Sequence, residues 1–594
     1  MALSSRLMLP LAAMANLAQS AHVHFDLELT WGLGAPNGQE RDMVFINGQF
    51  PGPPLIVDEG DDVTVKVKNN LPFNTTVHFH GIEQKNTAWA DGVPGLTQWA
   101  IKPEESFTYQ WHANNIYGTY WYHSHDMATL QDGLYGAVRV RPSPEREDPF
   151  SMITTDENEL RAIKQAEHDA ELIVVSDWSR YTSVDYMDAL KQTGYDIFCM
   201  DSVLIQGKGA VYCPPQSELI SLMPESVQNV LQANVTDKGC LPFVTGTQGL
   251  WEHHPEKLPA YLNDGCIPSN GYKAVIEVDP AHGWASLNFI GAASEKALVV
   301  SVDEHPMWIY EVDGRYIEPQ YVDTFEFYNG ERYSALIKLD KEPANYNITI
   351  TDTGGNQIIA GYATLQYAGG ENSTRPSVPY LNYGGQPTSP DVTALNVTNL
   401  PPFPAILPAP QADDFHILNL SRINSSWEWS LGGTTFLPAD LDSMEPVLFN
   451  KESPGLDNAL KITTRNNTWV DIVYQLRLGD PSVTPVQPPH PIHKHSNKMF
   501  VMGAGQGTFN WSSIEQGIVE SPQDFFEKPV YRDTVVTSPR GESWLAIRYF
   551  VQNPGPFLLH CHMETHLMSG MGLVLLDGYD VWDDIKNDSW LDPC

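Results

Sequence analysis

Apolar and polar residues alternate with a period of two along several short stretches of the chain. Residues 62–68 read Asp-Val-Thr-Val-Lys-Val-Lys, and residues 346–351 alternate in the same way. Because successive side chains of a strand point to opposite faces, this period predicts half-buried strands. Turn signals such as Asn47-Gly48 and Asp313-Gly314 recur at short spacing, and residues 157–170 are the best helical candidate. Short strands with frequent Gly and Pro predict an all-β chain of sandwiches or barrels.

Two polar stretches divide the chain. Residues 141–169 are charged and contain Pro, and they precede a new apolar strand at 171–175. Residues from about 368 to 411 are rich in Pro, Gly, Ser and Asn, which is typical of an extended connection. A chain of 594 residues is too long for one hydrophobic core. We therefore predict domains at 22–165, 166–370 and 411–594, with a linker at 371–410.

The net charge of the chain limits the kinds of partner that it can bind. The 73 acidic residues outnumber the 35 basic ones, and the net charge is -38. Nucleic acids and anionic membrane surfaces would repel such a protein, so we expect neither as a partner. No later stretch is long and apolar enough to span a bilayer. We expect a monomer.

The first residues resemble a secretory leader. Arg6 precedes a short apolar run at 7–18, and small residues follow at 19–21. This pattern predicts a signal peptide at 1–21 and a secreted, extracellular protein; a buried first strand or helix is the alternative. Sequons for N-glycans support secretion. They begin at Asn74, Asn234, Asn347, Asn372, Asn396, Asn419, Asn424, Asn466, Asn510 and Asn587.

The chain has six cysteines, and the first 198 residues contain none of them. They are Cys199, Cys213, Cys240, Cys266, Cys561 and Cys594. If Cys561 binds a metal, at most two disulfides form and one further thiol remains. Cys199 with Cys213 would close the shortest loop, but the sequence leaves the pairing open. Cys594 pairs with the middle domain or with nothing.

Ten histidines and one cysteine fall into four short clusters, two near each end of the chain. They read His78-Phe-His80-Gly81, His123-Ser-His125, His490-Pro-Ile-His493-Lys-His495 and His560-Cys561-His562-Met-Glu-Thr-His566. Imidazole and thiolate are the ligands that copper prefers, and one Cys with two His is the ligand set of a blue-copper site. The clusters predict several copper ions and electron transfer between them. Structural zinc is disfavoured, because its sites are closed four-ligand cages.

Strand geometry adds a connection between two sites. Alternate residues share a face, so the two histidines of each His-X-His pair can hold one metal from one side. In the last cluster, His560 and His562 share a face while Cys561 points to the opposite one. Cys561 can therefore bind one ion while its neighbours bind others. His566 lies past the strand end, where the chain can return to the Cys561 side.

This pattern resembles the multicopper oxidases, and in particular the laccase-like branch of ascomycete laccases and ascorbate-oxidase-like enzymes. The four clusters stand in the family's order, and Ser176-Asp177-Trp178 resembles the start of the family's second domain. The resemblance implies three cupredoxin-like Greek-key β-barrel or sandwich domains, with a trinuclear cluster between the first and the third. It implies four copper ions: type 1 held by His490, Cys561 and His566; type 2 by His78 and His493; and two type 3 ions, by His80, His123 and His562 and by His125, His495 and His560.

The resemblance also implies roles for three further residues. Glu564 and Asp91 match family acids near the cluster and are candidates for proton relay. The alternatives are a solvated surface acid for Glu564 and a turn-forming Asp-Gly pair for Asp91. Met571 occupies the axial position of type 1 copper, where a thioether is a weak ligand that tunes the potential. The alternative for Met571 is simple packing in the core.

These residues are compatible with several functions. The leading hypothesis is a laccase-like copper oxidoreductase that couples one-electron oxidation of phenolic donors to four-electron reduction of dioxygen to water. An ascorbate-oxidase-like enzyme is the alternative, favoured by Met571, and a ferroxidase is a third. An electron carrier without oxidase activity would need only the type 1 ligands, whereas this chain keeps both sets. His305 lies away from the clusters and is predicted to be structural.

Overall fold

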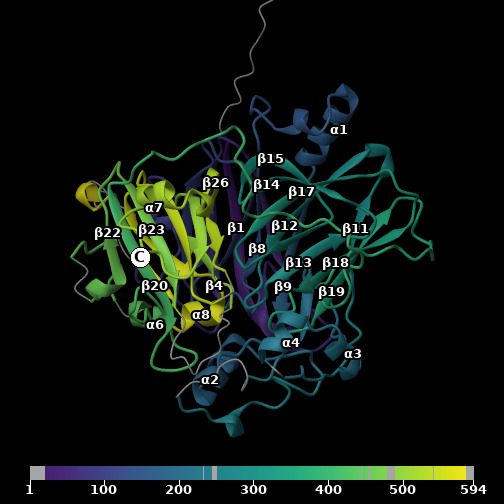
Figure 1. Ribbon diagram of the computed structural model, residues 1–594, viewed down its shortest axis with the longest axis horizontal. Helices are drawn as coiled ribbons and strands as arrows, with labels where there is room; N and C mark the ends of the chain where they lie inside the picture. Colours follow the sequence, from purple (N-terminus) through teal and green to yellow (C-terminus); the bar gives the residue numbers. More distant parts are fainter. Residues whose placement is uncertain are drawn as a thin grey trace, which may run out of the picture.

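The structure is a computed structural model that describes residues 21–231, 233–243, 251–442, 444–452, 455–477, 488–538 and 541–582. Strands dominate it and form six sheets, in three units of two packed sheets each (Figure 1). The first unit holds β1 to β8, the second β9 to β19 and the third β20 to β30. The predicted all-β class is confirmed. The exact domain boundaries stay a prediction, and residues 1–20 of the expected leader lie outside the described residues.

The first unit packs two four-stranded sheets around an apolar core. One sheet has the order β2 (Arg41–Ile46), β1 (His22–Gly34), β4 (Asp62–Asn70) and β6 (Ser106–His112). The other has the order β3 (Gly52–Asp58), β8 (Tyr135–Arg141), β7 (Gly118–Ser124) and β5 (Val77–His80). Val63, Val65 and Val67 of β4 are buried and contribute to one core with Val138 of β8. The period-two prediction at 62–68 is therefore confirmed.

The second and third units are larger and repeat the same plan. One sheet of the second unit has the strand order β10 (Ser202–Ile205), β9 (Glu171–Trp178), β12 (Trp284–Gly291), β17 (Arg332–Lys338), β14 (Met307–Val312) and β15 (Arg315–Val322). Its other sheet has the order β11 (Ala274–Val278), β19 (Ala360–Tyr367), β18 (Asn345–Asp352), β13 (Leu298–Val302) and β16 (Thr324–Phe327). One sheet of the third unit has the strand order β21 (Trp429–Leu431), β20 (Asp414–Arg422), β23 (Trp469–Leu476), β28 (Ser543–Phe550), β25 (Met499–Gln506) and β26 (Phe525–Arg532). Its other sheet has the order β22 (Lys461–Thr463), β30 (Gly572–Asp577), β29 (Gly555–Cys561), β24 (Pro491–Lys494) and β27 (Thr534–Val536).

A repeated strand pairing relates the three units. The opening strand of each unit pairs in parallel with a later strand: β1 pairs with β4, β9 with β12 and β20 with β23. The second sheet of each unit also has one parallel pair, in β3 with β8, β11 with β19 and β22 with β30. The other ladders are antiparallel, as Greek-key connections require. The amino-acid sequence showed no such repeat, because equal topology does not need equal residues.

The helices are short and lie outside the sheets. The predicted helix at 157–170 is confirmed as α1 (Glu157–His168), whose N-terminus is capped by the Asp156 carboxylate accepting from the Asn158 and Glu159 amides. The others are α2 (Ser183–Thr193), α3 (Gln216–Ser221), α4 (Glu225–Leu231), α6 (Pro438–Asp442), α7 (Ile514–Glu520) and α8 (Glu564–Met568). No helix in the described ranges is long and apolar enough to cross a membrane.

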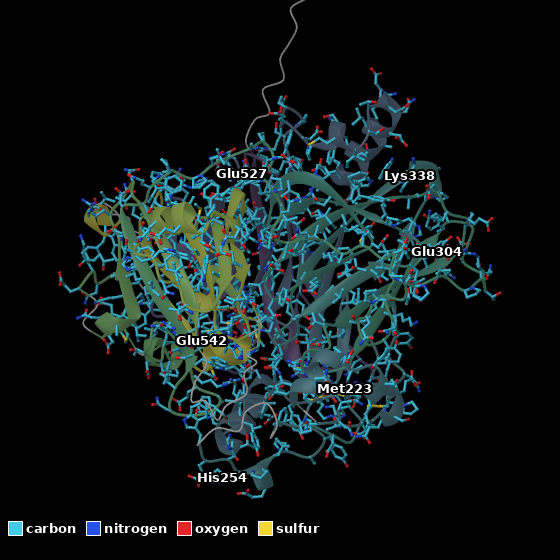
Figure 2. All side chains as sticks on the ribbon, viewed as in Figure 1. Met223, His254, Glu304, Lys338, Glu527 and Glu542 are labelled. Carbon is cyan, nitrogen blue, oxygen red and sulfur yellow. A yellow bond between two sulfur atoms is a disulfide. The ribbon has the colours of Figure 1, made fainter. Side chains whose placement is uncertain are left out.

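The predicted linker crosses the surface of the second unit. It has no helix or ladder strand over 371–410, but isolated bridges join Ala394 to Thr324 and Pro402 to Ile317. Charged side chains lie at the periphery of the molecule, as labelled Lys338 and Glu527 show in Figure 2. The acidic excess is thus carried mainly by surface groups that water solvates.

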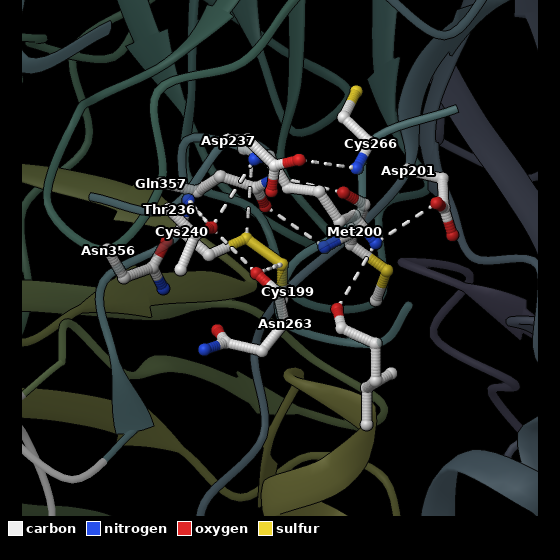
Figure 3. The surroundings of a disulfide bond; sticks show 12 residues. Cys199, Met200, Asp201, Thr236, Asp237, Cys240, Asn263, Cys266, Asn356 and Gln357 are labelled. Atoms are coloured by element: carbon white, nitrogen blue, oxygen red, sulfur yellow. Dashed lines mark hydrogen bonds and ion pairs between the residues drawn. A yellow bond between two sulfur atoms is a disulfide. The ribbon is translucent and has the colours of Figure 1, made fainter. Parts of the chain in front are cut away.

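Two disulfides join loops of the second unit. Cys199 pairs with Cys240 and Cys213 with Cys266, each at a Cα separation of 5.8 Å (Figure 3 shows the first). The short Cys199–Cys213 loop is therefore not formed. Cys561 is a free, buried thiol. Cys594 lies outside the described residues. Both bridges stabilise the long segment between β10 and β11, whose described residues form only short helices.

Removing a bridge is expected to destabilise this segment. The Cys199–Cys240 bridge spans 41 residues, and closing a loop of that length contributes about 4 kcal/mol through the unfolded state. A Cys199→Ser/Cys240→Ser variant should therefore lower the midpoint of urea unfolding. The first and third units should keep their spectra in the absence of urea, because both cysteines lie in the second unit. A midpoint equal to that of the parent protein would contradict the prediction.

Candidate metal centres

Two strand pairs bring the four histidine clusters together. His78 and His80 lie on β5, which pairs antiparallel with β7 so that His78 stands opposite His123. On the third unit, β24 pairs with β29 so that His493 stands opposite His560. His125 and His495 follow their strands directly. All of these side chains are buried, between the first and third units.

The ligand atoms of these histidines converge in small groups. Within each group the candidate atoms lie within 4.8 Å of one another: His80, His123 and His562; His125, His495 and His560; His78, His80 and His493; and His78, Asp91 and His495. The first two groups are the sets that the resemblance implied for the type 3 ions. The third contains His78 and His493, the pair implied for type 2. Among the described residues, no such group contains a residue of the second unit.

Unpartnered ring nitrogens identify the side that a metal would occupy. Nε2 of His78, His123, His125 and His493 is buried and has no hydrogen-bond partner. The opposite nitrogen is used: Nδ1–H of His78 donates to the Asp91 carbonyl oxygen (2.6 Å), and that of His123 to the Ser124 carbonyl oxygen (2.7 Å). A carbonyl only accepts, so Nδ1 carries the proton and Nε2 the free lone pair. Metal-binding histidines are oriented in this way, and the residues present therefore fit a metal cluster.

Burial favours the neutral form of several of these imidazoles. It lowers the pKa of His80, His123, His493, His495 and His560 well below the usual value; neighbouring imidazoles lower it further, whereas Asp533 opposes the shift at His80 and His493. It lowers the pKa of His125 and of His562 to about 3. A metal binds the neutral imidazole, so no proton has to be displaced before an ion is bound.

A separate group surrounds the free thiol. Cys561 Sγ lies 3.6 Å from Nδ1 of His566 and 3.8 Å from Nδ1 of His490, and the two Nδ1 atoms are 3.2 Å apart. The short helix α8 returns His566 to the Cys561 side, as the sequence predicted. Trp429 packs against both imidazoles, with ring centroids 4.8 and 4.6 Å away. Burial raises the pKa of the Cys561 thiol, so a thiolate here needs a bound cation.

Met571 lies beside this thiol. It is fully buried, its N–H donates to the His566 carbonyl oxygen (2.9 Å), and its carbonyl oxygen accepts from the Cys561 N–H (3.0 Å). The main chain thus holds Met571 next to two members of the group. This location agrees with an axial position and equally with packing in the core, so the axial role stays a prediction.

Both predicted acids are buried, and Asp91 contacts the cluster. The Asp91 carboxylate accepts from Nδ1–H of His495 at 2.9 Å, so Asp91 does more than form a turn. Glu564 is 4 % exposed, so the surface-acid alternative is wrong. Burial, with the nearby charge of Asp177, raises the pKa of Glu564 to about 8. A carboxyl group with this pKa holds a proton in neutral solution.

Four polar residues near the centres carried no sequence signal. Asp533 is ion-paired with Arg332 and contacts His80, and Asp196 is paired with Arg422 and lies 3.8 Å from Nε2 of His566. None of them belongs to a cluster of ligand residues, so only the fold reveals them. His305 is structural, as predicted: Nδ1 contacts the Asp303 carbonyl oxygen and Nε2 the Tyr367 hydroxyl, both at 2.6 Å.

Three β-sandwich units, a Cys–His site and an adjoining histidine cluster define a copper-binding oxidoreductase of cupredoxin type. Family models of multicopper oxidases match residues 28–145, 169–370 and 423–580. The chain belongs to the multicopper oxidase family, and it is a laccase-like, copper-dependent oxidoreductase.

Similar proteins cover nearly the whole chain. Laccase abr2 of Aspergillus fumigatus is 58% identical over 97% of this chain and 98% of its own. Multicopper oxidase GIP1 of Gibberella zeae is 45% identical over 98% of this chain and 88% of its own. The crystal structure of the laccase from Botrytis aclada has a TM-score of 0.68 at 21% identity, over 96% of this chain and 92% of that one. It shares the fold.

Proposed function

We propose that the protein is a secreted laccase that holds four copper ions and oxidises phenolic donors with dioxygen as the acceptor. The observation that carries the proposal is the completeness of both ligand sets, with buried ring nitrogens that lack any other partner. An electron carrier would need only the group around Cys561. The laccase relatives favour a phenolic donor over ferrous ion.

The proposed ligands follow the groups in the structure. His490, Cys561 and His566 would hold type 1 copper, with Met571 as a weak further ligand. Type 2 takes His78 and His493. The type 3 ions take His80, His123 and His562, and His125, His495 and His560. When bound, copper supplies one-electron acceptance at the first site and four-electron reduction of dioxygen to water at the other three.

The chain connects the two sites and supplies protons. Cys561 lies in one group while its neighbours His560 and His562 lie in the other, so the main chain itself joins them. The His560 Nδ1–H also donates to the Cys561 carbonyl oxygen at 2.8 Å, which shortens the connection. Glu564, two residues after His562, is a buried acid that holds a proton, and Asp91 orients His495. Burial of the histidines keeps bulk water away from the reacting centre.

Secretion has support from the surface and the disulfides. The sequon side chains of Asn74, Asn234, Asn372, Asn396, Asn419, Asn424 and Asn510 are exposed. Glycans could be added there without disturbing a core. Two disulfides persist best in an oxidising compartment. The sequon at Asn587 lies outside the described residues.

Copper content and donor preference test the proposal. The purified protein should contain four copper ions per chain, absorb as a blue copper–thiolate, and consume dioxygen with a phenol. Ascorbate and ferrous ion should be poorer donors at equal concentration, by kcat/KM. Removing copper with a chelator should abolish oxygen uptake, and adding copper back should restore it. Stoichiometric zinc, or a higher kcat/KM for ascorbate or ferrous ion, would overturn the proposal.

A further inference from the structure

The second unit supplies no candidate ligand, yet its β16–β17 turn reaches the histidine cluster. Gly330 stands in this turn with φ of +89°. A Cβ atom at this position would lie 2.9 Å from Cδ2 of His562 and 2.9 Å from Cε1 of His80. Two candidate ligands from different units therefore pack against one glycine of the second unit, and no larger residue fits between them.

Arg332, two residues further on, forms a buried ion pair with the third unit. Its Nη1 and Nη2 donate to Oδ1 and Oδ2 of Asp533 at 2.6 and 2.8 Å. Lys498 Nζ donates to Oδ2 at 3.1 Å. Two cationic side chains therefore contact the Asp533 carboxylate, and the two-pronged pairing with Arg332 fixes its orientation.

Asp533 contacts two candidate ligands. Its Oδ1 lies 3.3 Å from Nε2 of His80, and its main-chain oxygen accepts from Nδ1–H of His493 at 3.0 Å. The Thr534 hydroxyl lies 3.3 Å from the same two nitrogens. Nδ1 of His80 in turn faces Nε2 of His562 at 3.1 Å. His80 therefore presents Nδ1 to the cluster, whereas His78 on the same strand presents Nε2.

The glycine after His80 makes room for this ion pair. Gly81 has φ of +84°, and a Cβ atom there would overlap Arg332 Nη2 and lie 2.9 Å from Asp533 Oδ2. The His78–Gly81 motif thus ends in glycine because a side chain at this position would collide with the ion pair. The ion pair lies directly against the backbone that carries the ligand.

We propose that Asp533 is a positioning residue for the three-copper cluster: held by Arg332 of the second unit, it accepts from Nε2–H of His80 and fixes that ring with Nδ1 toward copper. The inference rests on the proposed function, because His80 must be a copper ligand for its orientation to matter. The second unit then takes part in the cluster through a residue that never touches the metal.

The test compares three variants of the holoenzyme. Asp533→Asn keeps the shape and removes the charge. Arg332→Lys keeps the charge and removes the two-pronged pairing. Asp471→Asn is the matched control, since Asp471 forms an equally buried, two-pronged pair with Arg548 at 2.6 and 2.7 Å, between β23 and β28, which carry no candidate ligand. Each protein is dialysed against graded chelator, and copper per chain, the blue absorption and the electron paramagnetic resonance of the cluster are recorded.

Asp533→Asn is expected to lose cluster copper at about 10- to 100-fold lower chelator concentration than the parent, as for other residues that orient a ligand. Its blue absorption should remain, because His490, Cys561 and His566 are untouched. Arg332→Lys should lose cluster copper at an intermediate concentration. Asp471→Asn should match the parent in copper retention even if it melts at a lower temperature.

Two outcomes would overturn the inference. One is retention of cluster copper by Asp533→Asn at the parent's level, and the other is equal loss from Asp471→Asn. If Asp533→Asn does not fold, Arg332→Lys decides, and parent-like retention by that variant overturns the inference. A parent protein that binds no copper would refute the proposed function instead, so the two failures are distinguishable.

Discussion

Replacing Cys561 by serine is expected to remove the blue absorption and to lower donor-driven oxygen consumption by more than about 100-fold, beyond the loss typical of a merely supporting residue. The serine hydroxyl has the shape of the thiol and is slightly smaller, but it is a hard ligand that holds copper poorly beside two imidazoles. Cys561 is also the residue that joins the two sites, since its neighbours His560 and His562 belong to the histidine cluster. The measurement is copper per chain, visible absorption and oxygen uptake with a phenol.

Met571→Leu is the control for this prediction. It changes a buried side chain whose main chain is bonded to that of Cys561, but it leaves the two imidazoles and the thiol in place. This variant should stay blue and active, with an altered potential if Met571 is the axial ligand. If Cys561→Ser still consumed dioxygen at the parent's rate, Cys561 would not belong to the copper site that accepts electrons from the donor.

Replacing Glu564 by glutamine should lower kcat about 100-fold or more, the usual contribution of a positioned proton donor. The amide keeps the shape and polarity of the side chain but has no acidic proton to give. Because burial and Asp177 raise the pKa of Glu564 to about 8, the carboxyl group is protonated in neutral solution before the reaction begins. Copper content and blue absorption should be unchanged, and reoxidation of the reduced enzyme by dioxygen should be the slowed step.

Glu295→Gln provides the matched comparison. Glu295 is another buried acid whose pKa burial raises, and it accepts from the Thr565 amide and hydroxyl at 3.1 and 2.9 Å. It supports α8 without belonging to any metal-binding group. The variant should therefore change kcat by less than about 10-fold. Equal losses in both variants would mean that Glu564 supports α8 and does not supply the proton.

The candidate ligands were largely predictable because each cluster spans only a few neighbouring positions of the sequence. Period-two strands place His78 with His80 and His493 with His495, and a strand that ends at Cys561 separates this thiol from His560 and His562. What joins these local pieces is pairing between strands, and β5 and β24 are buried on both faces. The resemblance then supplied the grouping that the structure reproduces.

The supporting residues were not predictable for an equally physical reason. Asp533 and Arg332 are separated by 201 residues, and neither lies in a pattern that marks it as polar and buried. The disulfides were also open, because the choice between Cys213 and Cys240 as the partner of Cys199 depends on loops without periodicity. Contacts of this kind exist only after three sandwiches have packed together.

The division of the ligands between β5 and β7 at one end of the chain and β24 and β29 at the other has a consequence for biosynthesis. When the first sandwich leaves the ribosome, it carries only four of the eight imidazoles of the candidate cluster, His78, His80, His123 and His125. Ion loading therefore has to wait until translation is nearly complete and the two ends have met. A cell that makes this protein needs its copper supply downstream of synthesis, where the finished chain is delivered.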